Sequence, residues 1–310
     1  MKLQNLKKQL LDNSIDKAEF IQCASQIHQV LFSYPEVLAS SEINEIRIDQ
    51  EGLAFQVGSD GLWLRCPSGE ARVAPLEIMN FGAYEPEETR LMLSLIADAK
   101  VILDIGANIG WFSLVFASGA PGADIHAFEP LPLFNRYLED NIALNNMGDR
   151  VFAHQFGFSD ECKSVEYFVD PGNGTNASLR NVADSETAQV IQGEVLTLDH
   201  WASENEIHPD FIKCDVEGAE YLVFQGATGV LTSVRPMVFL EMLRKWAKPY
   251  GYTPNDIIEF FSQFGYLCCG VSDTGNRLMD NVDEETVETN YLFLHRENHG
   301  PQIAQLGLKE

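Results

Sequence analysis

The sequence lacks a long apolar run, a paired cysteine motif and a leader-like N-terminus. No stretch approaches the roughly 20 apolar residues that a membrane-spanning helix needs, so we expect no stable membrane insertion. The first eleven residues hold three lysines, but polar amides interrupt the apolar positions, and no signal peptide is predicted. The six cysteines include no C-x-x-C spacing, which disfavours a zinc site or disulfide framework and suggests reduced thiols in a cytoplasmic protein.

Basic residues are also scarce. The chain has 21 lysines and arginines against 46 aspartates and glutamates, which gives a formal net charge of −25. Such a surface repels phosphate backbones and anionic lipid headgroups over a Debye length of roughly 8–10 Å. Neither nucleic acid nor a membrane surface is therefore an expected partner. With 310 residues and 45% hydrophobic content, the chain can bury one large core and carry a smaller accessory piece.

The first eighty residues differ in pattern from the rest. Residues 1–39 place apolar side chains at helical spacing, with a break near Asp12 and a stop at Pro35, which predicts two short helices. From 43 to 73 the apolar positions alternate between glycines, which is typical of a small antiparallel β element. We predict an accessory region over residues 1–80, through which a homo-oligomer would form.

Residues 81–310 predict a Rossmann-like α/β domain. A helix over 87–98 leads into alternating strands and helices. Strands are expected at 101–105, 125–128, 151–158, 211–214 and 238–241, and helices from 108, at 133–145 and at 219–225. Short apolar strands between amphipathic helices indicate a mostly parallel sheet, of about seven strands, with helices on both faces. A helix over 255–264 and edge strands at 266–271 and 291–294 complete it, with an antiparallel orientation open for one of them.

A glycine-rich turn joins the first strand of this domain to its helix. The segment reads Asp104-Ile105-Gly106-Ala107-Asn108-Ile109-Gly110, and its glycines allow the backbone to approach a ligand closely. Asn108 replaces the middle glycine of the dinucleotide fingerprint, and Asp104 adds an anion where a pyrophosphate would be repelled. Both features favour a cationic or zwitterionic ligand. Many α/β folds use such a turn for packing alone, so the turn needs support from other positions.

Two further positions give that support. Glu129 lies 19 residues after Gly110, at the end of the next strand, where a carboxylate can accept both hydroxyls of a ribose. The alternative for Glu129 is a solvated loop acid. Ser159 and Asp160 follow the next strand, where a short acid can accept the exocyclic amine of an adenine. The alternative for Asp160 is a turn cap, since aspartate commonly fills that role.

With these residues in place, the sequence resembles the FkbM-type methyltransferases, within the Rossmann-like S-adenosylmethionine enzymes. The likeness runs from about residue 75 to 295 and rests on motifs in the same order: Asn80-Phe81-Gly82-Ala83-Tyr84-Glu85-Pro86-Glu87, the turn from Asp104 to Ser113, Phe128-Glu129-Pro130, Ser159-Asp160, Asn176-Ala177-Ser178-Leu179, Thr197-Leu198-Asp199, and the segment from Asp210 to Glu220.

The resemblance implies a class I methyltransferase sheet that uses S-adenosylmethionine to O-methylate a sugar, glycan, glycolipid or secondary metabolite. The residues assigned to the cofactor are Glu85, Asp104, Gly106, Asn108, Gly110, Glu129, Pro130, Ser159, Asp160 and Asp215. Residues 170–178 are rich in glycine and amides, which suits a mobile lid with acceptor contacts at Asn176 and Ser178. A plain surface loop is the alternative for this segment.

Three acids are candidates for catalysis. Asp215, Glu217 and Glu241 follow or end predicted strands, at the edge where open α/β sheets bind ligands. The alternatives are a helix N-terminal acid for Glu217 and a rim acid for Glu241. Asp215 directly follows an apolar strand and ranks first. Lys213, inside that strand, is expected to pair with a nearby acid. His154 is expected to be structural, with His126 and His154 facing the site only if the strand parity is reversed.

Asp215 and Glu241 also raise the option of a metal. Two carboxylates at neighbouring strand ends repel each other, and either a shared proton or a bound Mg²⁺ relieves the repulsion. A general base without a metal is slightly favoured over a magnesium site. Two other functions remain open from sequence: an NAD-dependent oxidoreductase, although a full dinucleotide fingerprint and a separate substrate domain are not evident, and a non-catalytic cofactor-binding assembly module that acts through the N-terminal region.

Overall fold

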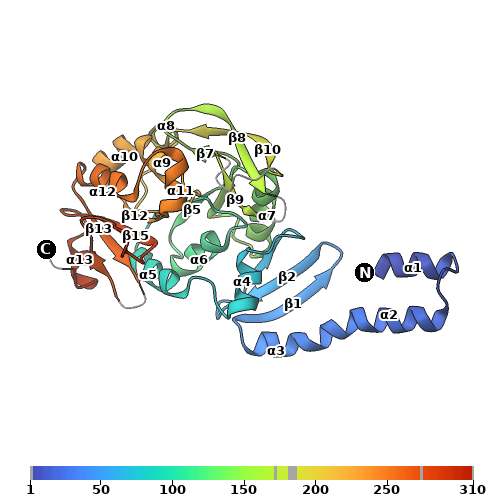
Figure 1. Ribbon diagram of the computed structural model, residues 1–310. Coiled ribbons are helices and arrows are strands. Elements are labelled where there is room, and N and C mark those ends of the chain that lie inside the picture. Colours follow the sequence, from blue (N-terminus) through green and yellow to red (C-terminus); the bar gives the residue numbers. More distant parts are fainter. Residues whose placement is uncertain (1–2, 171–172, 181–186, 273–274, 309–310) are drawn as a thin grey trace.

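The computed structural model describes residues 3–170, 173–180, 187–272 and 275–308, with only the backbone described over 173–177. Figure 1 shows a rounded α/β body from which the N-terminal helices extend to one side. Within the described ranges, no helix combines the length and the apolar character needed to cross a bilayer.

An eight-stranded sheet forms the centre of the body, in the order β14-β13-β15-β12-β11-β4-β5-β6. Its strands are β4 (Val101–Ile105), β5 (Asp124–Phe128), β6 (Val151–His154), β11 (Phe211–Cys214), β12 (Met237–Glu241), β13 (Tyr266–Val271), β14 (Arg277–Leu278) and β15 (Asn290–His295). The five strands from β6 to β12 are parallel, and β15 is antiparallel to both of its neighbours. The predicted mostly parallel α/β sheet is confirmed, and of the two strands expected to extend it, β15 is the antiparallel one and lies between β12 and β13.

Helices cover both faces of this sheet. One face carries α5 (Pro86–Ile96), α6 (Trp111–Gly119), α7 (Pro132–Leu144) and α13 (Gly300–Gln305), and the other carries α8 (Leu198–Glu204), α9 (Glu220–Gln225), α10 (Thr228–Ser233) and α12 (Pro254–Ser262). A short helix, α11 (Arg244–Ala247), and a 3₁₀ turn (Lys248–Tyr250) follow β12. Along β4, Ile102 packs into the first layer and Leu103 into the second. Strands buried on both faces explain the uninterrupted apolar runs in the sequence.

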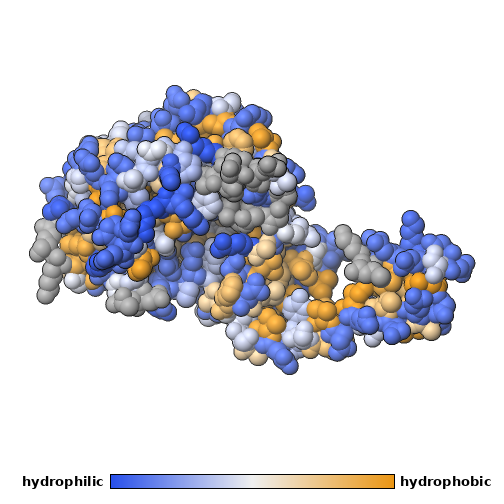
Figure 2. Space-filling model, in the orientation of Figure 1, coloured by the Kyte–Doolittle hydropathy of each residue, from blue (hydrophilic) through white to orange (hydrophobic). Residues whose placement is uncertain are grey.

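The N-terminal segment forms helices and then a small sheet, but the expected stop at Pro35 is wrong, because Pro35 lies in the first turn of a third helix. It contains α1 (Leu3–Leu11), α2 (Lys17–Gln29), a 3₁₀ turn (Val30–Ser33), α3 (Tyr34–Ala39), the antiparallel strands β1 (Ile43–Asp49), β2 (Gly52–Val57) and β3 (Leu62–Arg65), and α4 (Ala74–Phe81). Leu6 and Ala24 are buried where α1 meets α2. Figure 2 shows apolar side chains along this helical arm, and Leu31 and Phe32 are among the exposed ones. The boundary at residue 80 and self-association through this region stay predictions.

Two asparagines of α7 fasten the small sheet to the body. Asn141 is fully buried; its side chain accepts from the Arg65 N–H at 2.7 Å and donates to the carbonyls of Arg65 at 3.0 Å and Ile109 at 2.8 Å. Asn145 makes the same pair of bonds to the Trp63 N–H and carbonyl. The free edge of β3 is therefore paired with side-chain amides, and one of these also reaches the glycine-rich turn.

The structure corrects three further sequence expectations. Residues 151–158 are not one strand, because β6 belongs to the central sheet whereas β7 (Gly157–Phe158) joins a second sheet of order β7-β10-β8-β9. Residues 173–178 are a strand and not the expected loop, since β9 (Asn173–Ser178) pairs with β8 (Lys163–Asp170), which in turn pairs with β10 (Gln189–Leu196). Helix α6 begins at Trp111 and not at Asn108, because Asn108 and Gly110 both have positive φ.

We expect Asn141→Ala to lower the free energy of unfolding by about 2–4 kcal/mol, because three buried backbone groups lose their partner. Asn145→Ala is the matched control, since this half-buried site lets water replace the lost bonds, and its loss should be clearly smaller. Urea denaturation followed by circular dichroism measures both. Equal, small losses in the two variants would show that Asn141 does not fasten the small sheet.

Candidate functional site

The register of the central sheet brings four chain segments to one edge. Ile105 of β4 pairs with Phe128 of β5 and with Cys214 of β11, and Cys214 pairs with Leu240 of β12. These paired residues therefore lie at the same level, and the residues that directly follow them in the chain are Gly106, Glu129, Asp215 and Glu241. Ligands bind at this carboxyl edge in open α/β sheets. A pocket of about 270 Å³ lies here and is lined by all four of these residues.

Backbone hydrogen bonds hold the glycine-rich turn over the sheet edge. The N–H groups of Gly106 and Ala107 both donate to the Phe128 carbonyl at 3.0 Å, and the Asp215 N–H donates to the Ile105 carbonyl at 3.0 Å. Gly106 has φ +80°, and a Cβ on it would lie 1.8 Å from the Asp215 carbonyl oxygen. The turn thus excludes a side chain at Gly106 through contact with the neighbouring strand end.

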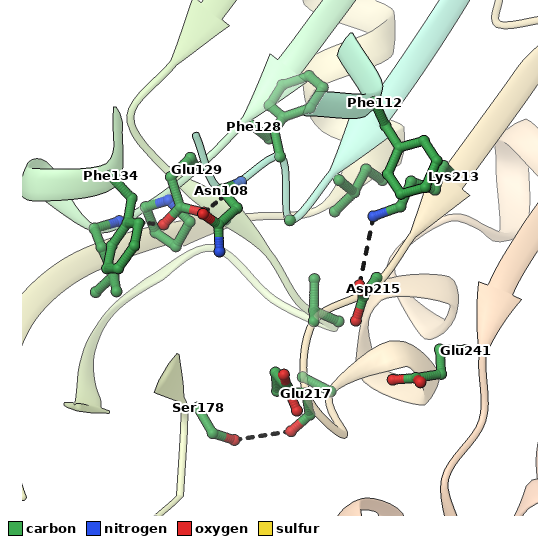
Figure 3. Close-up of a pocket in the computed structure, with 18 of the residues that line it drawn as sticks. Asn108, Phe112, Phe128, Glu129, Phe134, Ser178, Lys213, Asp215, Glu217 and Glu241 are labelled. Atoms are coloured by element: carbon green, nitrogen blue, oxygen red, sulfur yellow. Dashed lines mark hydrogen bonds and ion pairs between the residues drawn. The ribbon is translucent and has the colours of Figure 1, made fainter. Parts of the chain in front are cut away.

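Glu129 is buried beside this turn, and both of its carboxylate oxygens hold one backbone donor. Oε2 accepts from the Asn108 N–H at 3.0 Å, and Oε1 accepts from the Leu131 N–H at 2.9 Å. Burial raises the pKa of Glu129 to about 7, against the lowering effect of these two bonds. Each oxygen keeps a second lone pair, so Glu129 can accept two hydroxyl hydrogen bonds from a pocket ligand. Figure 3 shows Glu129 beside Asn108 at one end of the pocket.

A buried lysine, Lys213, lies between the glycine-rich turn and the opposite end of the pocket. Lys213 pairs in register with Asp104, and its Nζ lies 3.7 Å from Asp104 Oδ1 and 3.5 Å from Asp215 Oδ2. Burial disfavours the charged ammonium, but the surrounding carboxylates outweigh burial and raise the pKa of Lys213. The predicted pairing of Lys213 with a nearby acid is confirmed. Asp104 itself is fully buried, accepts from the Ser113 hydroxyl at 2.6 Å, and supports the pocket from behind without lining it.

Three glutamates join Asp215 at this end of the pocket. Burial, followed by repulsion from Asp215, raises the pKa of Glu85 to about 7, of Glu217 to about 8 and of Glu241 to about 9. One buried Glu217 oxygen, Oε2, has no hydrogen-bond partner. Figure 3 shows Glu217 and Glu241 grouped below Asp215. These carboxyl groups can hold or release protons near neutral pH.

Three of the seven residues other than glycine that have positive φ in the described chain line the pocket. Glu85, Asn108 and Glu217 have φ values of +45°, +53° and +53°, and all three line the pocket. A left-handed conformation in a residue other than glycine costs of order 1–3 kcal/mol, and such residues cluster at functional sites. The position of these three side chains is therefore maintained against a local conformational cost.

The end of the pocket beyond Glu129 is lined by apolar and aromatic side chains. Pro130, Phe134, Gly157, Phe158 and Tyr167 line it, which suits the faces of a planar heterocycle. Ser159 and Asp160, the sequence candidates for this role, do not line the pocket, because Ser159 is fully buried and its Oγ donates to Asp160 Oδ1 at 2.9 Å. Phe134 and Tyr167 were missed by the sequence analysis, although Tyr167 belongs to an alternating segment typical of a strand.

The remaining candidates lie in different places. Gly110 caps α6 away from the pocket, and a Cβ there would meet Leu138 at 2.6 Å, so Gly110 serves helix packing. Ser178 lines the pocket, and its Oγ donates to the Glu217 carbonyl at 3.0 Å. The backbone of Asn176 belongs to β9, but its side chain lies outside the described residues. His126 and His154 contact each other at 3.1 Å beside Trp201, outside the pocket.

The outer wall of the pocket was not expected from the sequence. It consists of Arg72, Val73 and Ala74 from the N-terminal segment, Tyr84, and Leu243, Lys245 and Trp246 from around α11. Apart from Tyr84, which belongs to the segment from Asn80 to Glu87, no local pattern marks these residues, because tertiary packing brings them to the pocket. Among the described residues, no group of three or more metal-binding side chains forms a cation site, so the magnesium option gains no support.

We expect Lys213→Met to lower the free energy of unfolding by about 3–5 kcal/mol, because it leaves the fully buried Asp104 without a cation. Lys248→Met, at an exposed position, is the control and should change stability by less than about 0.5 kcal/mol. Adding Asp104→Asn to Lys213→Met should recover part of the loss, since it removes the unpaired charge. Guanidinium denaturation of the four proteins measures this, and a loss below about 1 kcal/mol in Lys213→Met would contradict the buried network.

Comparison with known proteins agrees with this geometry. A family model described as a methyltransferase FkbM domain matches residues 104–268. The AMB antimetabolite synthetase AmbE of Pseudomonas aeruginosa is 38% identical over 141 residues, 43% of this chain and 6% of AmbE. The hexuronic acid methyltransferase AglP of Haloferax volcanii is 28% identical over 182 residues, 58% of this chain and 68% of AglP. The 2-O-methyltransferase NoeI of Sinorhizobium fredii is 32% identical over 151 residues, 44% of this chain and 60% of NoeI.

The matched segment is thus a small part of AmbE and more than half of AglP and NoeI. Because the family model covers more than half of the 310 residues, the chain belongs to the FkbM methyltransferase domain family.

Proposed function

We propose that this protein transfers a methyl group from S-adenosylmethionine to a hydroxyl of a sugar, a glycan or a secondary metabolite. The observation that carries the proposal is the polarity of the pocket, which is apolar and aromatic at one end, has a buried hydroxyl acceptor in Glu129, and is lined by carboxyl groups at the other end. The printed names of AglP and NoeI, a hexuronic acid methyltransferase and a 2-O-methyltransferase, support a sugar hydroxyl as the acceptor.

The residues of the pocket fit the parts of S-adenosylmethionine in order. The aromatic end suits the adenine, and Glu129 suits the two ribose hydroxyls. Asp215 and Glu85, beyond the glycine-rich turn, suit the ammonium and sulfonium charges. A dinucleotide fits less well, because its pyrophosphate would lie against Asn108 at the turn and close to buried carboxylates. The NAD-dependent alternative is therefore disfavoured by the charge of the site.

When bound, S-adenosylmethionine supplies a methyl group already activated by its sulfonium, so that the carbon–sulfur bond breaks as a carbon–oxygen bond forms. The protein must then orient the acceptor hydroxyl and take up its proton. Glu217 is the best placed acceptor for that proton, because its Oε2 faces no hydrogen-bond donor and burial brings its pKa to about 8. Asp215 is held by Lys213 at 3.5 Å and acts on the positive charge of the cofactor; Glu241 supports the same end.

We expect Glu129→Ala to weaken S-adenosylmethionine binding by about 2–3 kcal/mol, roughly 30- to 150-fold in Kd. Two hydroxyl acceptors are lost, and the N–H groups of Asn108 and Leu131 lose their partner. Glu129→Gln should lose less, since one oxygen remains. Calorimetric titration measures both, with Glu139→Ala on the exposed face of α7 as the control. Kd values within twofold of the parent protein in both Glu129 variants would remove Glu129 from the site.

We expect kcat to rise with pH around a midpoint near 8, because burial raises the pKa of Glu217 to about 8 and only the deprotonated form accepts a proton. Glu217→Gln should abolish this rise and lower kcat by roughly 10²–10⁴-fold, with an almost unchanged Kd for S-adenosylmethionine. Transfer of a tritiated methyl group to an acceptor found among sugars, glycolipids and polyketide alcohols measures it. Normal turnover in Glu217→Gln, with a collapse in Asp215→Asn or Glu241→Gln, would move the base to one of those acids.

A further inference from the structure

The acceptor end of the pocket is bordered by two cations from distant parts of the chain. Arg72 immediately precedes the turn into α4, and Lys245 belongs to α11; both line the pocket. Both act on the same group, since the positive charges of Lys245 and Arg72 lower the pKa of Glu217 against the effect of burial. In a chain with 21 basic and 46 acidic residues, two cations facing one carboxyl group are not expected from composition.

These cations are available to a ligand. Among the described residues Lys245 makes no ion pair, and its Nζ lies 4.7 Å from the centre of the Trp246 ring. Arg72 has a single ion-pair partner within the described chain, Glu77, at 3.5 Å, and its side chain is 66% exposed. Both residues are exposed, and an anion bound at Arg72 would share it with Glu77, whose side chain is 18% exposed.

Not all of the carboxyl groups near these cations carry a negative charge. Lys213 lies within 4 Å of Asp215 and Asp104, so its single positive charge offsets one of these two carboxylates from inside the protein. Glu217 and Glu241 are largely protonated at neutral pH, because burial raises the pKa of both above 7. Arg72 and Lys245 therefore lie beside acids that are largely uncharged at Glu217 and Glu241, in a protein with a formal net charge of −25.

Trp246 completes this wall. It is half-buried, lines the pocket and lies next to Lys245 in α11. A partly exposed indole offers a flat apolar face, on which the C–H face of a sugar ring or another compact ring can lie while polar substituents stay in water. An acceptor held in this way would have its anionic substituent beside the cations and a hydroxyl directed inward, toward Glu217.

We propose that the acceptor carries an anionic group, a carboxylate or a phosphate, which Arg72 and Lys245 hold while its hydroxyl lies at Glu217. This inference rests on the proposed methyl transfer and adds the charge of the acceptor to it. It also gives the N-terminal segment a role in the site, because Arg72 lies before residue 80 and selects the acceptor from outside the sheet.

Binding of small probes tests this inference without any turnover. The full chain is saturated with S-adenosylhomocysteine, and D-glucuronate, D-glucose 6-phosphate and D-glucose are titrated in turn. At least one anionic probe should bind roughly tenfold more tightly than glucose, and added salt should remove most of the difference because the cations are exposed. Comparison of the two anionic probes shows whether the site takes a carboxylate or a phosphate.

Variants connect the effect to the two side chains. Arg72→Gln combined with Lys245→Gln should reduce the affinity of the anionic probe to that of glucose and leave S-adenosylhomocysteine affinity unchanged. Lys245→Arg should retain anion binding, and Lys248→Gln, at a neighbouring exposed lysine outside the pocket, is the control. Equal binding of glucose, failure of both anions to bind, or unchanged affinity in the double variant would each overturn the inference. Absence of S-adenosylhomocysteine binding in the parent protein would instead refute the proposed methyl transfer.

Discussion

The buried ammonium of Lys213 is the interaction on which the pocket depends. It lies between Asp104, which is fully buried behind the glycine-rich turn, and Asp215, which faces the pocket, at 3.7 and 3.5 Å. An unpaired charge in this position would be costly. With the lysine present, two strands of the sheet can carry carboxylates at the same level, and a cationic ligand can be bound by acids that are already held in place.

The sheet register then places two groups of pocket residues side by side along the carboxyl edge of the central sheet. The ends of β4 and β5 supply the turn and Glu129, which are suited to a nucleoside, while the ends of β11 and β12 supply Asp215, Glu217 and Glu241. Asn141 extends this framework outward, because it bonds both to β3 and to the carbonyl of Ile109 in the turn. The small N-terminal sheet and the nucleoside end are therefore positioned by the same buried side chain.

Much of the central sheet is predictable from the sequence, because strands such as β4 and β11 are buried on both faces and read as continuous apolar runs. Glu129 is predictable for a related reason, since its distance from the turn is fixed by one helix and one strand. The second sheet was missed, because Gly157 and Phe158 change sheets within one apolar segment and β9 is rich in glycine and asparagine. Arg72 and Trp246 reach the pocket only through tertiary packing, which no local pattern reports.

The central claim is that this edge binds S-adenosylmethionine and not a phosphate-bearing dinucleotide. Calorimetric titration of the full chain with S-adenosylmethionine, followed by NADH as competitor, tests it most directly. Because the pocket is lined by carboxyl groups and has a hydroxyl acceptor in Glu129, S-adenosylmethionine should bind with a micromolar or lower Kd, and excess NADH should not displace it. Displacement by NADH, or no binding of S-adenosylmethionine to the correctly folded protein, would contradict the account.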